Sequence, residues 1–366
     1  MRGRFQDETS RQTANAAGPI FNESVITGET ILVTGAGGSI GSALTKAILR
    51  LGPRHLILLD HSERNLYEID AGLSMTPGTS HTAVLGDVCD ITLVDDLIEQ
   101  HQPSVIYHAA AFKHVPLMET NPFAAVRNNA LGTASLARIC RARGVPTLVL
   151  VSTDKAVNPI SIMGASKRIA ELALLHSNSP RSRMTAIRLG NVFGSQGSVV
   201  PAFAAQIHRG GPVMVTHPDV SRYFFTIAEA VELILLAPEV GEVGGILVPR
   251  LSAAVKILQI AREMIDEAQS ESDGDVSIIF TGLRPGDKMV EEFLYEDEFA
   301  EPSSDPRLFH AKTQRIPANG FDRHIEDLVK QVEERDLTSM IETVCKIVPA
   351  YRPTELLERT KKGSLV

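Results

Sequence analysis

Three residues with reactive side chains follow an apolar run near the middle of the chain. Residues 149–152 read Val-Leu-Val-Ser, and Thr153, Asp154 and Lys155 come next. Such a run predicts a buried strand, and open α/β sheets bind their ligands at the carboxyl ends of such strands. A hydroxyl, a carboxylate and an amine at that position could divide the work of proton transfer. The alternative is a strand end capped by solvated charges.

Met163 and Lys167 stand beyond this strand end, four residues apart. On a helix they would share one face, so the helix would bring Lys167 back over the strand end, with Met163 at a helix start that faces a polar pocket. Lys167 would then converge with Asp154 and Lys155. The sequence therefore predicts a candidate catalytic site made by a strand end and the helix that follows it.

A glycine-rich turn is the second signal. Gly35, Gly38 and Gly41 follow a short apolar strand and open a helix, so the backbone can approach a pyrophosphate and the helix N-terminus can stabilise its charge. Asp60 ends the next predicted strand, 19 residues beyond Gly41, where a carboxylate would accept hydrogen bonds from ribose hydroxyls. That carboxylate would repel a 2′-phosphate and favours NAD over NADP, although the nearby Arg64 weakens the preference. A purely structural turn is the alternative.

Strands and helices alternate along the first half of the chain. The predicted strands are 31–34, 55–60, 82–87, 104–111, 146–153 and 184–189. The predicted helices are 42–50, 63–73, 91–101, 120–143 and 162–175. This order is typical of an α/β fold with a Rossmann-type doubly wound parallel sheet. After Gly190 the pattern becomes irregular, which indicates a smaller C-terminal lobe.

These elements divide the chain into four parts. We expect a mobile N-terminal tail at 1–28, a NAD-binding Rossmann domain at 29–190, a mainly substrate-binding lobe at 191–350 with some segments returning to the Rossmann domain, and a C-terminal tail at 351–366. The predicted helix at 162–175 has too many apolar residues for one stripe, so it should be buried on more than one side. Packing against a second subunit is one way to bury it, and a homo-oligomer, a dimer or higher, is expected.

Composition limits the compartment and the partners. The 366 residues carry a net charge of -8 and 43% are hydrophobic, which suits a soluble globular protein without a basic field for nucleic acid. The three cysteines have no paired spacing, which argues against a disulfide framework, and no metal site is expected. The sequence shows neither an apolar leader nor a long apolar run, so a cytoplasmic protein without a membrane span is expected.

Six motifs together resemble those of a known enzyme family. They are 34–41 (TGAGGSIG), 59–63 (LDHSE), 108–116 (HAAAFKHVP), 152–156 (STDKA), 163–167 (MGASK) and 283–288 (LRPGDK). From Thr30 to about Glu292 the chain resembles the nucleotide-sugar 4,6-dehydratases of polysaccharide biosynthesis, which are extended short-chain dehydrogenase/reductases. It is most similar to the UDP-N-acetylglucosamine 4,6-dehydratase branch. The resemblance implies a NAD-dependent lyase that converts UDP-N-acetylglucosamine to a UDP-4-keto-6-deoxy-N-acetylhexosamine. The membrane region of many larger members is not carried over.

Met163 departs from the superfamily pattern. A tyrosine usually stands four residues before the lysine and removes the proton of the sugar hydroxyl, whereas the thioether of Met163 cannot accept a proton. One interpretation is a decayed, non-catalytic cofactor-binding protein, and the other is that a neighbour takes over this role. The resemblance favours the second, because a sub-branch of these dehydratases is similar in having Met beside an intact Thr-Asp-Lys. Asp154 is then the substitute.

The resemblance also implies roles for the other site residues. Lys155 would be the base at C5, Asp154 the acid for the C6 hydroxyl, and Thr153 a hydrogen-bond partner of the C4 oxygen. Lys167 would bind the nicotinamide ribose. Lys155 must be neutral to act, so its pKa should be depressed by burial or by Lys167 and the nicotinamide charge. The sub-branch resembles enzymes that retain configuration at C5, so retention is expected.

The resemblance to this family also implies which further residues contact the cofactor and the substrate. The cofactor would also contact Ser39, Ile40, Arg64, Asp87, Val88, Ala109, Ala110, Ala111 and Asn129. The UDP-sugar would contact Lys113, His114, Asn191, Arg222 and Arg284. A structural role for His114 and a surface salt bridge for Arg222 are the alternatives. A nucleotide-sugar 4-epimerase or 4-reductase, which needs no Asp-Lys pair, and a non-catalytic NAD-binding module are the alternative functions.

Overall fold

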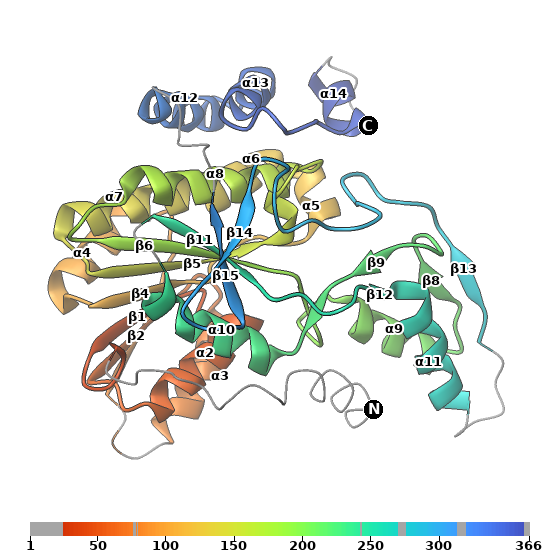
Figure 1. Cartoon of the computed structure of the whole chain (residues 1–366), viewed down its shortest axis with the longest axis horizontal. Coiled ribbons are helices and arrows are strands. Elements are labelled where there is room, and N and C mark those ends of the chain that lie inside the picture. The colour runs from red at the N-terminus through yellow and green to blue at the C-terminus, as the bar shows by residue number, and fades with distance from the viewer. Residues whose placement is uncertain are drawn as a thin grey trace.

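A computed structural model of the chain describes residues 25–75, 78, 80–241, 244–269, 276–312 and 320–361. The predicted tail at 1–28 lies outside this part except for residues 25–28. The described residues form a large α/β unit and a smaller lobe, which lies to the right in Figure 1. None of the described helices has the length and the apolar sequence needed to cross a bilayer.

One sheet of nine strands organises the described chain. Its order is β14-β15-β11-β6-β5-β4-β1-β2-β3. The bounds are β1 Thr30–Thr34, β2 His55–Asp60, β3 His81–Leu85, β4 Val105–His108, β5 Thr147–Thr153, β6 Arg183–Leu189, β11 Gly245–Pro249, β14 Phe299–Pro302 and β15 Leu308–Lys312. The strands from β3 to β11 pair in parallel, whereas β15 and β14 are antiparallel additions. The doubly wound parallel sheet predicted from the sequence is confirmed.

The register of the central strands gathers polar residues at one edge. Thr34 at the end of β1 is opposite His108 at the end of β4, and β5 runs three residues beyond the partner of His108, Leu150, to end at Thr153. Every residue of β1 and β4 is buried, as expected for parallel strands that are covered on both faces. The candidate site therefore lies where β1, β4 and β5 end.

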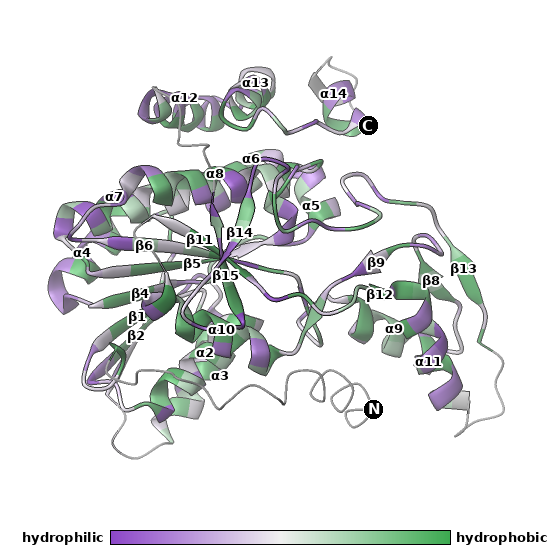
Figure 2. Ribbon diagram, in the orientation of Figure 1, coloured by the Kyte–Doolittle hydropathy of each residue, from purple (hydrophilic) through white to green (hydrophobic). Residues whose placement is uncertain are grey.

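Helices cover both faces of the sheet (Figure 1). On one face lie α2 (Ser39–Arg50), α3 (Glu63–Ser74) and α10 (Ile227–Val240), and on the other lie α4 (Ile91–His101), α7 (Thr133–Arg143) and α8 (Ile162–Ser177). The apolar residues of these helices join those of the strands in one large core. Figure 2 shows the hydrophobic colouring concentrated in the strands and in helices such as α8 and α10.

The segment between β4 and α7 differs from the sequence prediction. The predicted strand 104–111 stops at His108, because Ala109 and Ala110 turn away to lie against the glycine-rich loop. The predicted helix at 120–143 is interrupted. It consists of α6 (Pro122–Ala125), a π-helix at Val126–Gly132 and α7, and it is preceded by α5 (Val115–Thr120).

Helix α8 is buried on two sides, and residues of the same chain pack against both of them. Ala170 and Leu174 join the main core, whereas Ile169 and Leu172 join a second cluster with α12 (Phe321–Glu333) and α13 (Leu337–Ile347). These helices form an additional layer above α8 in Figure 1. The predicted burial of α8 on more than one side is confirmed and needs no second subunit, and the homo-oligomer stays a prediction.

The predicted C-terminal tail at 351–366 is also partly wrong. Tyr351 and Leu357 are each 1% exposed and belong to the second cluster. Helix α14 (Glu355–Lys361) follows, and the Thr354 hydroxyl donates to Glu119 Oε2 at 2.6 Å. Apolar contacts and this hydrogen bond hold the segment on the helix layer.

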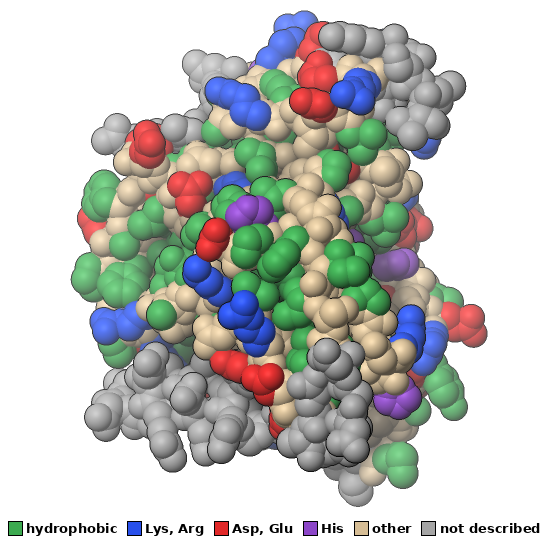
Figure 3. All heavy atoms as spheres, turned by 90° about the vertical axis from the view of Figure 1, so that its right-hand side faces the viewer, with side chains coloured by type: hydrophobic (Ala, Val, Ile, Leu, Met, Phe, Trp, Pro, Cys, Tyr) green, Lys and Arg blue, Asp and Glu red, His purple; other side chains and the backbone are tan. Residues whose placement is uncertain are grey.

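The smaller lobe has its own hydrophobic cluster. The lobe consists of α9 (Val199–His208), α11 (Ile257–Gln269), β8 (Val213–Val215), β9 (Ser221–Arg222), β12 (Val255–Lys256) and β13 (Ile278–Phe280). Met214 of β8 and Ile279 and Phe280 of β13 are exposed. Figure 3, which views the molecule from the side of this lobe, shows hydrophobic side chains gathered on that face beside basic ones.

Candidate active site

Thr153, Asp154 and Lys155 lie together at the end of β5. The strand passes into a single 3₁₀ turn, Asp154–Ala156, and the Thr153 hydroxyl donates to Asp154 Oδ1 at 2.8 Å. Lys155 Nζ lies 3.0 Å from the same oxygen and donates to Asn191 Oδ1 at 3.1 Å. Asp154 is fully buried, and its Oδ2 has no protein partner. A free carboxylate oxygen therefore lies beside an amine, as proton transfer would require.

Glu291, which the sequence analysis did not single out, completes the surroundings of Lys155. Its Oε1 lies 3.5 Å from Lys155 Nζ and 3.6 Å from Arg222 Nε. The residue is 3% exposed, and its Oε2 has no protein partner. The sequence signal was weak, since Glu291 stands three residues beyond the 283–288 motif and beside another glutamate.

Arg222 supports the segment that carries Glu291. Its Nη atoms donate to the carbonyl oxygens of Ser221, Met289 and Lys288 at 2.7, 3.1 and 2.8 Å. The side chain is 9% exposed. This environment fits a positioning residue better than either the predicted diphosphate contact or the alternative of a surface salt bridge.

The charge state of Lys155 differs from the prediction. Burial lowers its pKa, but the negative charges of Asp154 and Glu291 outweigh burial, so the pKa is raised above its usual value. The prediction of a depressed pKa considered burial and neighbouring cations, and it missed the second carboxylate. Lys155 is therefore an ammonium in the protein alone.

The pKa of Lys167 shifts in the opposite direction to that of Lys155. Burial lowers the pKa of Lys167 to about 8, although the charge of Glu171 opposes this. The amine donates to the carbonyl of Val151 at 2.8 Å, so the side chain reaches back over β5 as its spacing suggested. At neutral pH a cation is thus held just behind the Asp154–Lys155 turn.

Met163 is 2% exposed and belongs to the second hydrophobic cluster, so it does not face a polar pocket. The helix start itself packs on Lys155: a Cβ at Gly164 would lie 2.2 Å from the Lys155 carbonyl oxygen. Ser161 caps the helix by accepting from the Gly164 N–H at 3.1 Å. The thioether therefore fills apolar space, and proton chemistry depends on other residues.

The glycine-rich loop brings two backbones into contact. A Cβ at Gly35, whose φ is +69°, would lie 2.6 Å from Ala110 N, and one at Gly41 would lie 2.0 Å from Gly35 O. Helix α2 follows with Gly38 as its N-cap and without a side-chain cap. Its first N–H groups are thus available for an anion, as the motif predicts. Ile40 is half-buried in this first turn.

Asp60 closes this loop from the next strand. Its Oδ2 accepts from the Gly37 N–H and its Oδ1 from the Ser62 N–H, both at 2.9 Å. Carboxylate oxygens keep further lone pairs, so ribose hydroxyls can still bind. Arg64 is exposed and paired with Glu68 at 3.0 Å, which directs its charge along the surface of α3.

A buried chain of hydrogen bonds joins β1, β4 and the π-helix. His108 Nδ1 lies 2.6 Å from Thr34 Oγ1, and its Nε2 lies 2.9 Å from Thr133 Oγ1. The Thr133 hydroxyl donates to Asn129 O, so His108 must donate from Nε2 and accept at Nδ1. Burial and the charge of Lys167 lower the pKa of His108 to about 3, which keeps it neutral.

The side chain of Asn129 forms its hydrogen bonds within the protein and connects two segments. Its side chain bonds the N–H and C=O of Phe112 at 2.8 and 2.9 Å and donates to Ser166 Oγ at 3.1 Å. It therefore ties the loop after β4 to α8, beside the predicted cofactor channel. Ala111 is half-buried in that loop.

The other residues predicted from the sequence lie around the carboxyl ends of the sheet strands. Asp87 accepts from Arg127 Nη1 at 3.0 Å, Val88 is buried, and Ser39 accepts from Gln196 N at 3.1 Å. Burial and the charges of Lys113 and Arg284 lower the pKa of His114, so a neutral imidazole lies near these two cations.

Comparison with known proteins places the chain in a family. The model of a family described as "Polysaccharide biosynthesis protein" matches residues 31–313. The chain belongs to this polysaccharide biosynthesis protein family.

Three proteins illustrate the relationships of this polysaccharide biosynthesis family member. It is 41% identical over 316 residues to the capsular polysaccharide biosynthesis protein CapD of Staphylococcus aureus, covering 85% of this chain and 53% of CapD. It is 32% identical to a UDP-glucose 4-epimerase of Rickettsia rickettsii, covering 80% and 84%. The solved structure of Pen from Bacillus thuringiensis matches with a TM-score of 0.73 and 26% identity, covering 79% and 90%. The chain spans about half the length of CapD.

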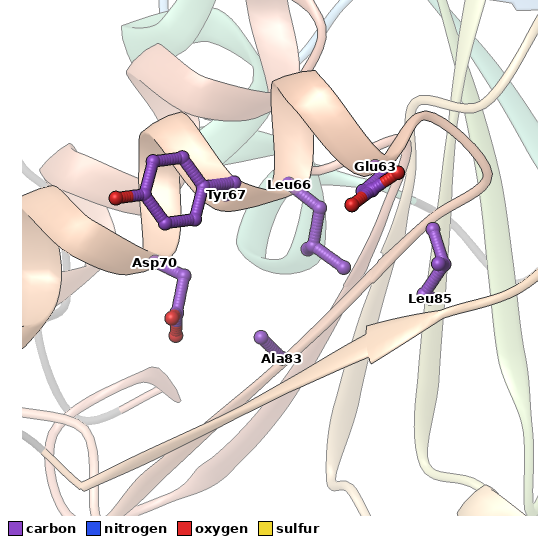
Figure 4. Close-up of a pocket in the computed structure, with 6 residues that line it drawn as sticks. All are labelled: Glu63, Leu66, Tyr67, Asp70, Ala83 and Leu85. Carbon is purple, nitrogen blue, oxygen red and sulfur yellow. The ribbon is translucent and has the colours of Figure 1, made fainter.

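A surface hollow of the family member lies away from these groups. It is formed between α3 and β3 at the sheet edge (Figure 4) and is lined by Glu63, Leu66, Tyr67, Asp70, Ala83 and Leu85. It contains none of the predicted site residues, so it adds nothing to the candidate active site.

A charge cluster is fully buried behind the site. Arg188 of β6 pairs with Glu171 at 3.0 Å and with Glu298 at 2.6 Å, and Arg168 pairs with Glu171 at 2.8 Å. The Ser152 hydroxyl also donates to Glu171 Oε1 at 2.6 Å. This cluster joins β5, β6 and α8 to the segment that carries Glu291. No sequence motif pointed to it.

Gly41→Ala should destabilise the protein by at least about 1–3 kcal/mol and abolish dinucleotide binding, because the new methyl would collide with backbone atoms that cannot move aside. Chemical denaturation and titration calorimetry with NAD measure the two effects. Gly72→Ala in α3 is the matched control, since its Cβ would meet nothing within 4 Å and should stabilise the helix slightly. Equal behaviour of the two variants would contradict the close packing of the loop.

Proposed function

We propose that this chain is a NAD-dependent 4,6-dehydratase of UDP-N-acetylglucosamine that serves polysaccharide biosynthesis. The observation that carries this proposal is the Asp154–Lys155 pair, held at 3.0 Å at the end of β5, two strands along the sheet from β1 and its glycine-rich loop. A base and an acid side by side are what removal of water across C5 and C6 requires. The family, and the capsular polysaccharide relative, support the pathway.

Two residues can balance the protons of this reaction. Asp154 would accept the proton of the C4 hydroxyl during C4 oxidation and pass it to the C6 hydroxyl, which leaves as water. Lys155, after its ammonium has lost a proton, would accept the C5 proton and return it when C6 is reduced. Asp154 and Lys155 then end in their starting states. Met163 has no part in this scheme, consistent with its burial among apolar side chains.

The cofactor would lie along the loop and strand ends already described. A bound nicotinamide would supply the acceptor and donor of the C4 and C6 electrons. Gly35, Gly38 and the first turn of α2 would hold the pyrophosphate, and Asp60 would hold the adenosine ribose and disfavour a 2′-phosphate. Lys167, a cation with a lowered pKa, would bind the nicotinamide ribose and stabilise negative charge at O4.

The UDP end of the substrate would meet Lys113 and His114 on the loop after β4 and Arg284 of the 283–288 motif. Lys113, His114 and Arg284 lie close enough for their charges to interact, and burial lowers the pKa of Lys113. Converging cationic side chains suit a diphosphate. His114 also touches the loop at Gly197, where a Cβ would lie 2.4 Å from its ring.

A UDP-sugar 4-epimerase is the second candidate, and the Rickettsia relative favours it. An epimerase needs oxidation and reduction at C4 but no base at C5. Asp154 could still accept the C4 hydroxyl proton, but Lys155 would then have no task, so the dehydratase explains more of the site.

Incubation with UDP-N-acetylglucosamine, with NAD or NADP added in separate arms, tests the proposal. Mass spectrometry should show loss of one water with NAD as the better cofactor, and NMR should show a 4-keto-6-deoxy product with the original configuration at C5. Retention is expected because Lys155 would return a proton on the face from which it removed one. An unchanged mass with inversion at C4 would establish the epimerase, and an L-configured product would refute retention.

A further inference from the structure

Lys155 lies between two buried carboxylates, not one. Asp154 Oδ1 is 3.0 Å and Glu291 Oε1 is 3.5 Å from its Nζ. Each carboxylate has a second oxygen that is buried and lacks a protein partner. Leaving such oxygens unpaired costs free energy, so they mark positions where a function outweighs stability.

The chain builds this arrangement through several independent contacts. Arg222 holds the 288–291 segment by the carbonyls of Lys288 and Met289, and Lys288 Nζ donates to Val157 O at 2.7 Å. The segment is thereby fastened both to β9 and to the turn that carries Lys155. The position of Glu291 is therefore fixed by its neighbours and does not depend on a mobile side chain.

The charges around Lys155 balance only in the resting state. Lys155 and Arg222 carry two positive charges, and Asp154 and Glu291 carry two negative ones. When Asp154 accepts the C4 hydroxyl proton it becomes neutral, so Glu291 is the remaining anion next to the ammonium. The base at C5 must be neutral, so Lys155 must lose a proton although the charge of Glu291 favours the ammonium.

We propose that Glu291 is a positioning residue that holds Lys155 beside Asp154 and controls when the amine gives up its proton. In this step the Lys155 N–H bond breaks and the proton leaves to solvent, and the amine is protonated again from solvent after it has returned the C5 proton. The inference rests on the proposed function for its catalytic consequence. The effect of Glu291 on the charge of Lys155 holds without it.

Trace acetylation of Lys155, followed by peptide mass spectrometry at fixed alkaline pH, tests the electrostatic part. Removing one of two neighbouring charges in Glu291→Gln should lower the pKa of Lys155 by about one pH unit and raise its acetylation rate roughly tenfold relative to exposed Lys330. Glu292→Gln is the matched control, because Glu292 is half exposed and pairs with Lys288 instead. An unchanged Lys155 rate in Glu291→Gln would overturn the inference.

The pH profile of water loss tests the catalytic part. In Glu291→Gln the limb on which turnover rises with pH should move about one pH unit lower, whereas Glu291→Asp should keep the wild-type limb. A purely structural role would lower turnover at every pH without moving the limb, and that result would refute the proposal. If no water loss occurs in the wild type while acetylation responds as expected, the proposed function fails and the pairing of Glu291 with Lys155 stands.

Discussion

Lys155→Ala should reduce water loss from UDP-N-acetylglucosamine by about three orders of magnitude, because no other amine in the described part of the chain pairs with Asp154 at the end of β5. C4 oxidation does not require the C5 base, so a reduced-cofactor signal should still build up on substrate addition. The measurements are product mass and nicotinamide absorbance. Exchange of the C5 hydrogen with deuterated solvent should be lost as well.

Lys256→Ala is the control for this variant. Lys256 lies in the small lobe and pairs with Asp219 on the surface, so its removal should leave turnover unchanged. Dehydration at the wild-type rate in Lys155→Ala would remove Lys155 from the mechanism. Loss of both dehydration and the absorbance signal would instead show that Lys155 is needed to bind substrate or to oxidise C4.

The parts of the site that follow local sequence rules could be predicted. Gly35 and Gly41 are required by backbone contacts of 2.6 and 2.0 Å, and Asp60 lies at the loop because parallel strands end at the same sheet edge. The meeting of Asp154 with Lys155 follows from their adjacency. Fold and cofactor loop were thus readable from periodicity and glycine spacing.

The parts that depend on contacts between distant segments could not be predicted. Glu291 reaches Lys155 from 136 positions further along the chain, through carbonyl contacts of Arg222 that no motif encodes. The raised pKa of Lys155 depends on that contact, so the expectation of a depressed pKa failed with it. The cover of α8 by α12 and α13 was missed for the same reason, since a buried helix face does not reveal which segment buries it.

Arg188→Met should lower the free energy of unfolding by about 3–5 kcal/mol, because it leaves Glu171 and Glu298 as buried carboxylates without their main partner. Urea denaturation measures the change. Arg359→Met is the control: Arg359 pairs with Glu355 and both side chains are exposed, so its loss should cost at most about 1 kcal/mol. A similar small effect in Arg188→Met would show that the buried cluster adds little stability.

The pH dependence distinguishes a charge effect from a packing effect in Arg188→Met. In the wild type, burial raises the pKa of Glu171 but Arg188 and Arg168 lower it to about 2. Its stabilisation is therefore complete above its ordinary value of 4.5 and is lost as pH falls toward 2. Without Arg188 the pKa of Glu171 rises, so the variant binds protons on folding and is stabilised by mild acid. The difference in free energy of unfolding between the wild type and Arg188→Met should therefore become smaller from neutral pH to pH 5. A difference that stays constant with pH would show that the loss of stability comes from packing alone.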